Sequence, residues 1–242
     1  MKSKAPTLLS RAFSLVELLV VISIIAIVAG FAVPAVTTMI RGSQITQSSQ
    51  MISDQIALAR QIALSRNRSV EVRFYKYADP ETPGESPADP STGFFRGMQN
   101  FEILENGGAL PLGPVQRLPA NVIMNEGKFS TLLNKGERAR ITADKLSPAD
   151  PEIPGMPPGY EKSYEYSALR FLPDGSTDLP LVTAGGDSGT VKDDSWYITL
   201  HGTHVSKDAA VSDGLTDTMP ANYFTLQIDP TTGSTRAYRP NL

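Results

Sequence analysis

The sequence predicts an α+β protein in which a long N-terminal helix packs against a β-rich head. Residues 13–33 form one apolar run, and residues 35–67 continue with a helical period. From residue 69 onward the pattern changes to short runs separated by proline and glycine, which is typical of antiparallel strands. We therefore expect a basic leader at 1–12, a long helix at 13–67 and a globular head at 68–242.

Composition and charge limit the function classes. The hydrophobic fraction of 40% and the charged fraction of 19% are ordinary for a folded chain. The formal net charge is −3, which gives no reason to expect nucleic acid as a partner. Because the chain has no cysteine, disulfides and thiolate metal sites are excluded.

The apolar run predicts a membrane anchor. Residues 13–33 read FSLVELLVVISIIAIVAGFAV, and as a helix they would span about 30 Å. The basic residues Lys2, Lys4 and Arg11 precede this run, and no basic residue follows it before Arg41. Since lysine and arginine flanks stay in the cytoplasm, we expect a single span with its N-terminus inside and its head outside.

Glu17 is the only strongly polar residue within this run. A carboxylate inside such a span costs about 2–3 kcal/mol or more unless a partner or water compensates it. One interpretation is that Glu17 lies near enough to the interface to reach water. The other is that a cation meets Glu17 inside an assembly.

The residues around Glu17 favour the second interpretation. Residues 11–20 read RAFSLVELLV, in which a basic and a small residue precede Phe13 and the apolar run. This segment resembles the prepilin processing site of type IV pilins and type II secretion pseudopilins. The resemblance implies that a membrane peptidase cuts between Ala12 and Phe13, removes leader 1–12, and that Phe13 is then N-methylated. The family usually has glycine before the cut, so Ala12 predicts slower cleavage.

The resemblance also implies the partners of the chain. These are other pilin or pseudopilin subunits, the prepilin peptidase and methylase, an inner-membrane assembly platform and membrane lipid. The cleaved Phe13 would carry a free amine, and Glu17 of a neighbouring subunit would offset the desolvation of that cation. Glu17 would thus set the register of assembly, first in the cytoplasmic membrane and then in a fibre.

Beyond the apolar run the helix is expected to continue with one buried face. Pro34 removes one backbone hydrogen bond, so we expect it to kink the helix and not to end it. The residues after it place an apolar stripe on one side of a helix, which predicts packing against the head. The stripe consists of Ile45, Ile52, Ile56, Ala59 and Ala63.

Short alternating runs predict the strands of the head. They lie at 69–77, 98–105, 168–175 and 196–202, followed by a hairpin at 223–239 whose turn is DPTTG. The first run alternates like a half-buried strand. The RFLPDG segment and the terminal hairpin also resemble H-type minor pseudopilins and FimT-like proteins. The segments at 79–93 and 147–159 are rich in proline and are expected to be exposed loops.

Few residues point to chemistry. His201 and His204 have the spacing of a metal pair, but they follow a strand with Gly202 between them, and only Asp208 lies nearby as a third ligand. The GDSG sequence at 186–189 resembles a protease nucleophile motif, yet it is better explained as a turn. Calcium binding is a remote alternative, because its oxygen donors fit no defined loop. These donors are Asp187, Asp193 and Asp194. We expect no catalytic site, cofactor or metal.

Three alternatives remain open at this point. A major pilin is disfavoured because such proteins often carry a C-terminal disulfide, and because long loops suit a minor subunit better. A secreted β-domain would use the apolar run as a signal peptide, cut after the small-residue sequence Val33-Pro34-Ala35 to leave Val36 first. The third is a membrane-tethered enzyme or binding module whose head acts alone.

Overall fold

The computed structural model describes residues 14–78, 85, 93–126, 129–134, 164–180, 196–203 and 222–239. The chain divides into two compact units, residues 1–41 and 42–242. One helix, α1 (Leu15–Arg66), contributes residues to both units. It ends one residue before the predicted limit at 67, and position 34 lies within it. Among the residues that the structure describes, no helix is long and apolar enough to cross a bilayer.

The end of α1 is set by a left-handed cap. Asn67 has a φ of 52°, and the N–H of Arg68 donates to the carbonyl oxygen of Ala63 at 3.3 Å. This pairing satisfies a carbonyl that the helix itself leaves without a partner. The chain then turns directly into the first strand.

The described strands of the head form one antiparallel sheet in the order β6-β1-β2-β5-β7-β8-β9, with β3 and β4 paired to β2. Their bounds are β1 (Val70–Tyr77), β2 (Phe94–Ile103), β3 (Ala109–Pro111), β4 (Gln116–Arg117), β5 (Val122–Met124), β6 (Glu165–Phe171), β7 (Trp196–Gly202), β8 (Tyr223–Ile228) and β9 (Thr235–Tyr238). The α+β prediction is confirmed, and β7 has the predicted bounds. β2 and β6 begin earlier than expected.

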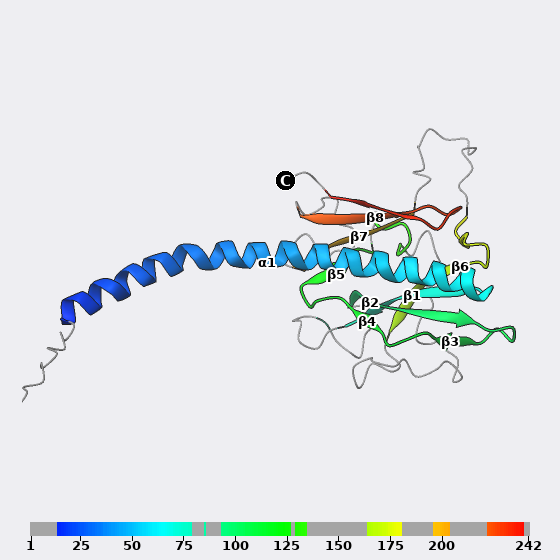
Figure 1. Cartoon of the computed structure of the whole chain (residues 1–242), viewed down its shortest axis with the longest axis horizontal. Helices are drawn as coiled ribbons and strands as arrows, with labels where there is room; N and C mark the ends of the chain where they lie inside the picture. The colour runs from blue at the N-terminus through cyan, green and yellow to red at the C-terminus, as the bar shows by residue number, and fades with distance from the viewer. Residues whose placement is uncertain are drawn as a thin grey trace, which may run out of the picture. The chain divides into compact units, whose positions relative to one another are not determined.

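The sheet curves around residues 42–66 of α1, which belong to the second unit. Figure 1 shows β7 and β8 on one side of the helix and β1 and β2 on the other. All five residues of the predicted apolar stripe are 0–3% exposed and belong to one core with the inner side chains of the sheet. The helical period of the sequence therefore identified the buried face of α1 correctly.

The prediction that 69–77 is a half-buried strand was wrong. Every residue of β1 is buried, although its side chains alternate between the two faces of the sheet. Val72 and Phe74 point into the helix-covered core. Glu71 and Arg73 lie on the opposite face, where an ion pair and aromatic rings surround them. Charged residues can be buried in this way when they are paired.

The predicted exposed loop at 79–93 also needs a correction at its two described residues, Glu85 and Gly93, since neither is exposed and Gly93 is buried. The side chains of Glu85 and Arg96 are each 4% exposed and form an ion pair at 2.7 Å. Nη1 and Nη2 of Arg96 each donate to one carboxylate oxygen of Glu85 at 2.7 Å, so the geometry is bidentate. This buried pair explains why an acidic loop residue is not in solvent. Most of that segment, and all of 147–159, lies outside the described residues.

The terminal hairpin prediction is confirmed, including its DPTTG turn. The N–H of Gly233 donates to the carbonyl oxygen of Asp229 at 2.8 Å, and Gly233 has a φ of 65°. The turn docks on the segment after β6, because the N–H and hydroxyl of Thr177 both donate to the carbonyl oxygen of Pro230, at 3.0 and 2.8 Å. The hairpin is thus tied to the opposite end of the curved sheet.

Candidate assembly site at the start of helix α1

Ser14 caps the N-terminus of α1. Its side-chain oxygen accepts a hydrogen bond from the N–H of Glu17 at 3.1 Å, and its carbonyl oxygen accepts the first helical bond from Leu18 at 3.1 Å. A serine in this position satisfies one of the N–H groups that a helix start leaves free. Ser14 therefore sets where the helix begins and places Glu17 in the first turn.

The sequence contained a signal for this cap. Ser14 and Glu17 have the S-x-x-E spacing of a capping box directly before an apolar run. The prediction treated Glu17 only as a charge within that run and did not consider its backbone. The role of Ser14 was missed for that reason.

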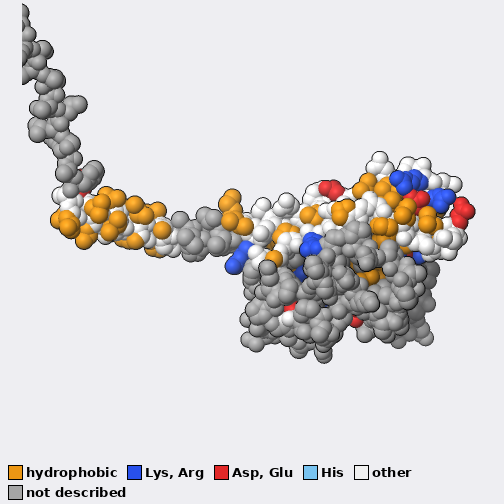
Figure 2. All heavy atoms as spheres, turned by 90° about the horizontal axis from the view of Figure 1, so that it is seen from below, with side chains coloured by type: hydrophobic (Ala, Val, Ile, Leu, Met, Phe, Trp, Pro, Cys, Tyr) orange, Lys and Arg blue, Asp and Glu red, His pale blue; other side chains and the backbone are white. Residues whose placement is uncertain are grey.

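The first described turns of α1 expose apolar side chains on every side. All side chains from Ser14 to Phe31 are exposed, and the large hydrophobic ones range from 45% at Val21 to 81% at Leu15. Figure 2 shows hydrophobic side chains gathered over this segment. An apolar surface of this extent requires lipid or other protein chains to cover it. Glu17 is the carboxylate within it.

The helix itself stabilises Glu17 only in part. An acidic residue in the first turn gains about 0.3–1 kcal/mol from the positive end of the helix dipole. Placing a carboxylate in hydrocarbon costs about 2.5–3.5 kcal/mol on an insertion scale. On the order of 2 kcal/mol must then come from another source, such as water at the interface or a cation of a second chain.

The structure does not test the roles predicted for Glu17 or for the other site residues. Ala12 and Phe13 lie outside the described residues, so cleavage and methylation stay predictions. Pro34 lies within α1, but its side chain is not described and the predicted kink is untested. The GDSG turn, the three aspartates weighed for calcium, His204 and Asp208 all lie outside the described part of the chain.

His201 is buried in the sheet. Its Nδ1 lies 3.0 Å from the carbonyl oxygen of Gly202 and its Nε2 lies 3.3 Å from Nδ2 of Asn125. Burial lowers the pKa of His201, and the hydrogen bond to Gly202 opposes this shift only in part. A neutral ring that donates from Nδ1 and accepts at Nε2 satisfies both contacts. His201 thus has the environment of a structural residue.

A buried charged cluster occupies the outer face of β1. The carboxylate of Glu71 binds Arg73 at 2.7 Å and Arg170 at 2.8 Å. Burial alone would raise the pKa of Glu71, but the two guanidinium groups together lower it below its ordinary value. The guanidinium of Arg73 also lies over the rings of Phe101 and Tyr166, with distances of 4.3 and 4.7 Å to their centroids. These contacts hold the strands together.

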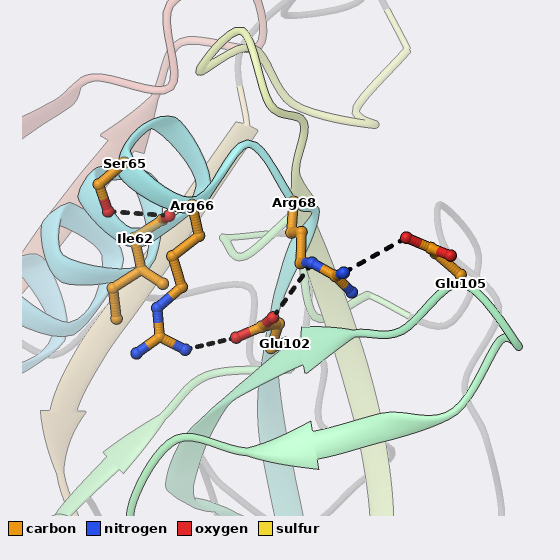
Figure 3. A network of polar contacts seen from close by, with 6 residues as sticks. All are labelled: Ile62, Ser65, Arg66, Arg68, Glu102 and Glu105. Atoms are coloured by element: carbon orange, nitrogen blue, oxygen red, sulfur yellow. Dashed lines mark hydrogen bonds and ion pairs between the residues drawn. The ribbon is translucent and has the colours of Figure 1, made fainter.

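A second charged network ties the end of α1 to the sheet (Figure 3). Arg66 on the helix pairs with Glu102 on β2, and Arg68 contacts Glu102 at 3.6 Å and Glu105 at 3.3 Å. The side chain of Glu102 is 10% exposed, whereas that of Glu105 is 91% exposed. In the described part of the head, these charged networks therefore connect the helix and strands of the head to one another.

Comparisons with known proteins bear on the N-terminal segment. Residues 9–33 match the family model described as the prokaryotic N-terminal methylation motif. The chain has a prepilin-type N-terminus. The resemblance of this segment to the prepilin processing site is thereby confirmed. A motif of this kind indicates a membrane-anchored N-terminus with a head outside the cytoplasm, and assembly with other pilin subunits after the action of the prepilin peptidase.

The solved structures that are similar to the chain include two at low sequence identity. One is the minor pseudopilin EpsH from the type 2 secretion system of Vibrio cholerae, with 9% identity, a TM-score of 0.38, and coverage of 82% of this chain and 99% of that one. The other is the type IV minor pilin FimU of Pseudomonas aeruginosa, with 10% identity, a TM-score of 0.37, and coverage of 82% and 90%. No curated protein sequence matches the chain.

Proposed function

We propose that this chain is a structural subunit, of the minor pseudopilin type, in a pseudopilus or type IV pilus-like fibre. The prepilin-type motif at 9–33 is the single observation that carries the proposal. Processing between Ala12 and Phe13 leaves an N-methylated Phe13 on a subunit held in the inner membrane by α1. The assembly platform then moves the subunit from lipid into the fibre.

Glu17 has the central role in this proposal. Its side chain is exposed within an apolar surface, and the helix dipole covers only part of its desolvation cost. The amine of Phe13 on a neighbouring subunit supplies the missing cation. Each charge then compensates the other, and subunits that are out of register leave both unpaired.

The test compares Glu17→Gln with a matched carboxylate change in the head, Glu105→Gln. Glu17→Gln should leave processing unchanged but lower recovery of the subunit in the sheared fibre fraction at least tenfold. Glu105→Gln should change neither quantity, because Glu105 is 91% exposed at its side chain. Equal recovery of the two variants would remove the proposed role of Glu17.

The mature N-terminus separates this proposal from the secreted-domain alternative. Mass spectrometry of the membrane form should find a chain that begins at Phe13 and carries one additional methyl group. A chain that begins at Val36 would lack Glu17, and the fibre proposal would then be wrong.

A further inference from the structure

The two edges of the described sheet differ in how their backbone groups are used. At β6, the N–H of Arg170 donates to Oδ1 of Asp178 at 2.9 Å, and its carbonyl oxygen accepts from the N–H of Asp178 at 2.9 Å. Asp178 therefore occupies the outward N–H and carbonyl groups of Arg170, which hinders the addition of another strand at this end of β6. β9 is the other end of the strand order and pairs with β8 alone among the described strands.

The register of the terminal hairpin shows which groups of β9 point outward. The N–H of Asp229 donates to the carbonyl oxygen of Ser234 at 2.9 Å. Because hydrogen-bonded and non-hydrogen-bonded pairs alternate, the next pair, Ile228 and Thr235, is non-hydrogen-bonded. The same alternation makes Ala237 a non-hydrogen-bonded position. Thr235 and Ala237 thus present their N–H and C=O groups away from β8, and no described backbone group bonds to them.

The side chains along this edge are basic and exposed. Residues 235–239 contain Arg236 and Arg239 and no acidic residue. Arg236 and Arg239 are exposed, and Tyr238 is 48% exposed. The nearest acid along the hairpin is Asp229, whose Oδ1 already accepts from the N–H groups of Thr231 and Thr232 at 2.8 and 3.1 Å. Among the described residues, the edge therefore combines two outward N–H groups and two outward carbonyl oxygens with two exposed arginines. The charge of Arg236 acts on Asp229, and Arg239 donates to Thr46 at 3.2 Å and to Asn222 at 3.5 Å, so neither guanidinium is bound to a carboxylate by an ion pair in this part of the chain.

We propose that the edge of β9 binds an extended, acidic segment of another fibre subunit by strand addition, an inference that rests on the proposed function. A peptide strand is the chemistry that matches two donors and two acceptors at strand spacing. Its alternate side chains would lie beside Arg236 on the outer face, so carboxylates at those positions add charge complementarity. The described edge is short, so the contact is weak alone and depends on the fibre for proximity.

Photocrosslinking in cells tests this contact in the full chain. Tyr238→p-benzoylphenylalanine keeps an aromatic side chain and places the reactive group beside the edge. We expect an adduct with another prepilin-type subunit, mapped by mass spectrometry to a segment with acidic residues at alternate positions. An adduct with a second copy of this chain, with nucleic acid or with neutral segments only would overturn the inference, as would the lack of an adduct.

Two further changes separate hydrogen bonding from charge. Ala237→Pro removes an outward N–H and leaves the β8 ladder intact, so the adduct should fall about three- to tenfold, the value of one hydrogen bond. Ala237→Val keeps that N–H and should retain the yield. Arg236→Glu should lower the yield as well, while Arg117→Glu, an exposed residue on β4, should not. If all four variants give the parent yield, the edge does not bind a strand.

The outcome also distinguishes the inference from the proposed function. A methylated Phe13 and normal fibre recovery, together with an unchanged adduct in Ala237→Pro and Arg236→Glu, would overturn only the strand-addition contact. A chain that begins at Val36 would overturn both.

Discussion

At β1 the two faces of the sheet are both buried, but different chemistry holds them. The inner face covers α1 with aliphatic and aromatic side chains, among them Val72 and Phe74 of β1. On the outer face, Glu71 pairs with Arg73 of the same strand, and Arg73 lies over the rings of Phe101 and Tyr166. Stability on the inner face follows from apolar area and packing. On the outer face it depends on complete pairing of charges, so the two faces should respond differently to substitution.

The largest expected effect is on the inner face. Phe74 is 0% exposed, and Phe74→Ala should lower the free energy of unfolding by about 3–5 kcal/mol, because it removes apolar contacts and leaves a cavity. Leu58→Ala, on a helical residue that is 44% exposed, should cost less than about 1 kcal/mol. Urea denaturation of both variants measures the difference. Similar losses in the two variants would contradict the core assignment.

The next effect is on the outer face. Glu71→Gln removes the carboxylate that Arg73 contacts at 2.7 Å, and an unpaired buried charge should cost on the order of 3 kcal/mol. The double change Glu71→Leu with Arg73→Leu should cost less than the single one, since it leaves no unpaired charge at these positions. Urea denaturation again provides the measurement, and a larger loss in the double variant would contradict this account.

Lowering the pH should also reduce the free energy of unfolding of the parent protein, because it protonates Glu71. The pKa of Glu71 is lowered from its ordinary value of 4.5, so the native state holds the carboxylate charged. Its contribution to stability is complete above pH 4.5 and is lost as the pH falls through the lower native pKa. Glu71→Gln should lack this part of the acid sensitivity.

The two faces of the sheet differ in how far their burial could be predicted from the sequence. The stripe from Ile45 to Ala63 was predicted because apolar residues at a helical period indicate a core without further information. Glu71 and Arg73 alternate with apolar residues, which also fits a solvent-exposed face, so their burial depends on partners such as Arg170 that are distant in sequence. Strands β3 to β5 have only two or three residues each and are too short for a periodic pattern.

The same limit applies to the site at the start of α1. Local sequence identified Glu17 and the processing motif, since both lie within a few residues of each other. The open edge at β9 depends on the register of a hairpin and on which strand ends the sheet. Neither follows from the order of residues in the hairpin alone.

A turn that packs against the inner core should tolerate substitution less well than one in solvent. Gly233 and Gly107 have φ values of 65° and 80°, so both strain any other residue. A Cβ at Gly233 would lie 2.5 Å from the ring of Phe171, whereas Gly107 has open space. Gly233→Ala should therefore cost about 2–3 kcal/mol and Gly107→Ala about 1 kcal/mol in thermal unfolding. Equal costs would show that backbone strain alone determines both.

The smallest expected effect is a pH dependence at His201 on the outer face. Burial lowers the pKa of His201 below its ordinary value of 6.5, so the unfolded chain takes up a proton first as the pH falls. The contribution of this residue is complete above pH 6.5 and is lost as the pH falls toward the lower native pKa. The urea midpoint between pH 7.5 and 5 should therefore fall less in His201→Gln than in the parent protein. His204→Gln changes the only other histidine and should keep the parent slope. If His201→Gln has the same slope as the parent protein, protonation of His201 does not oppose folding.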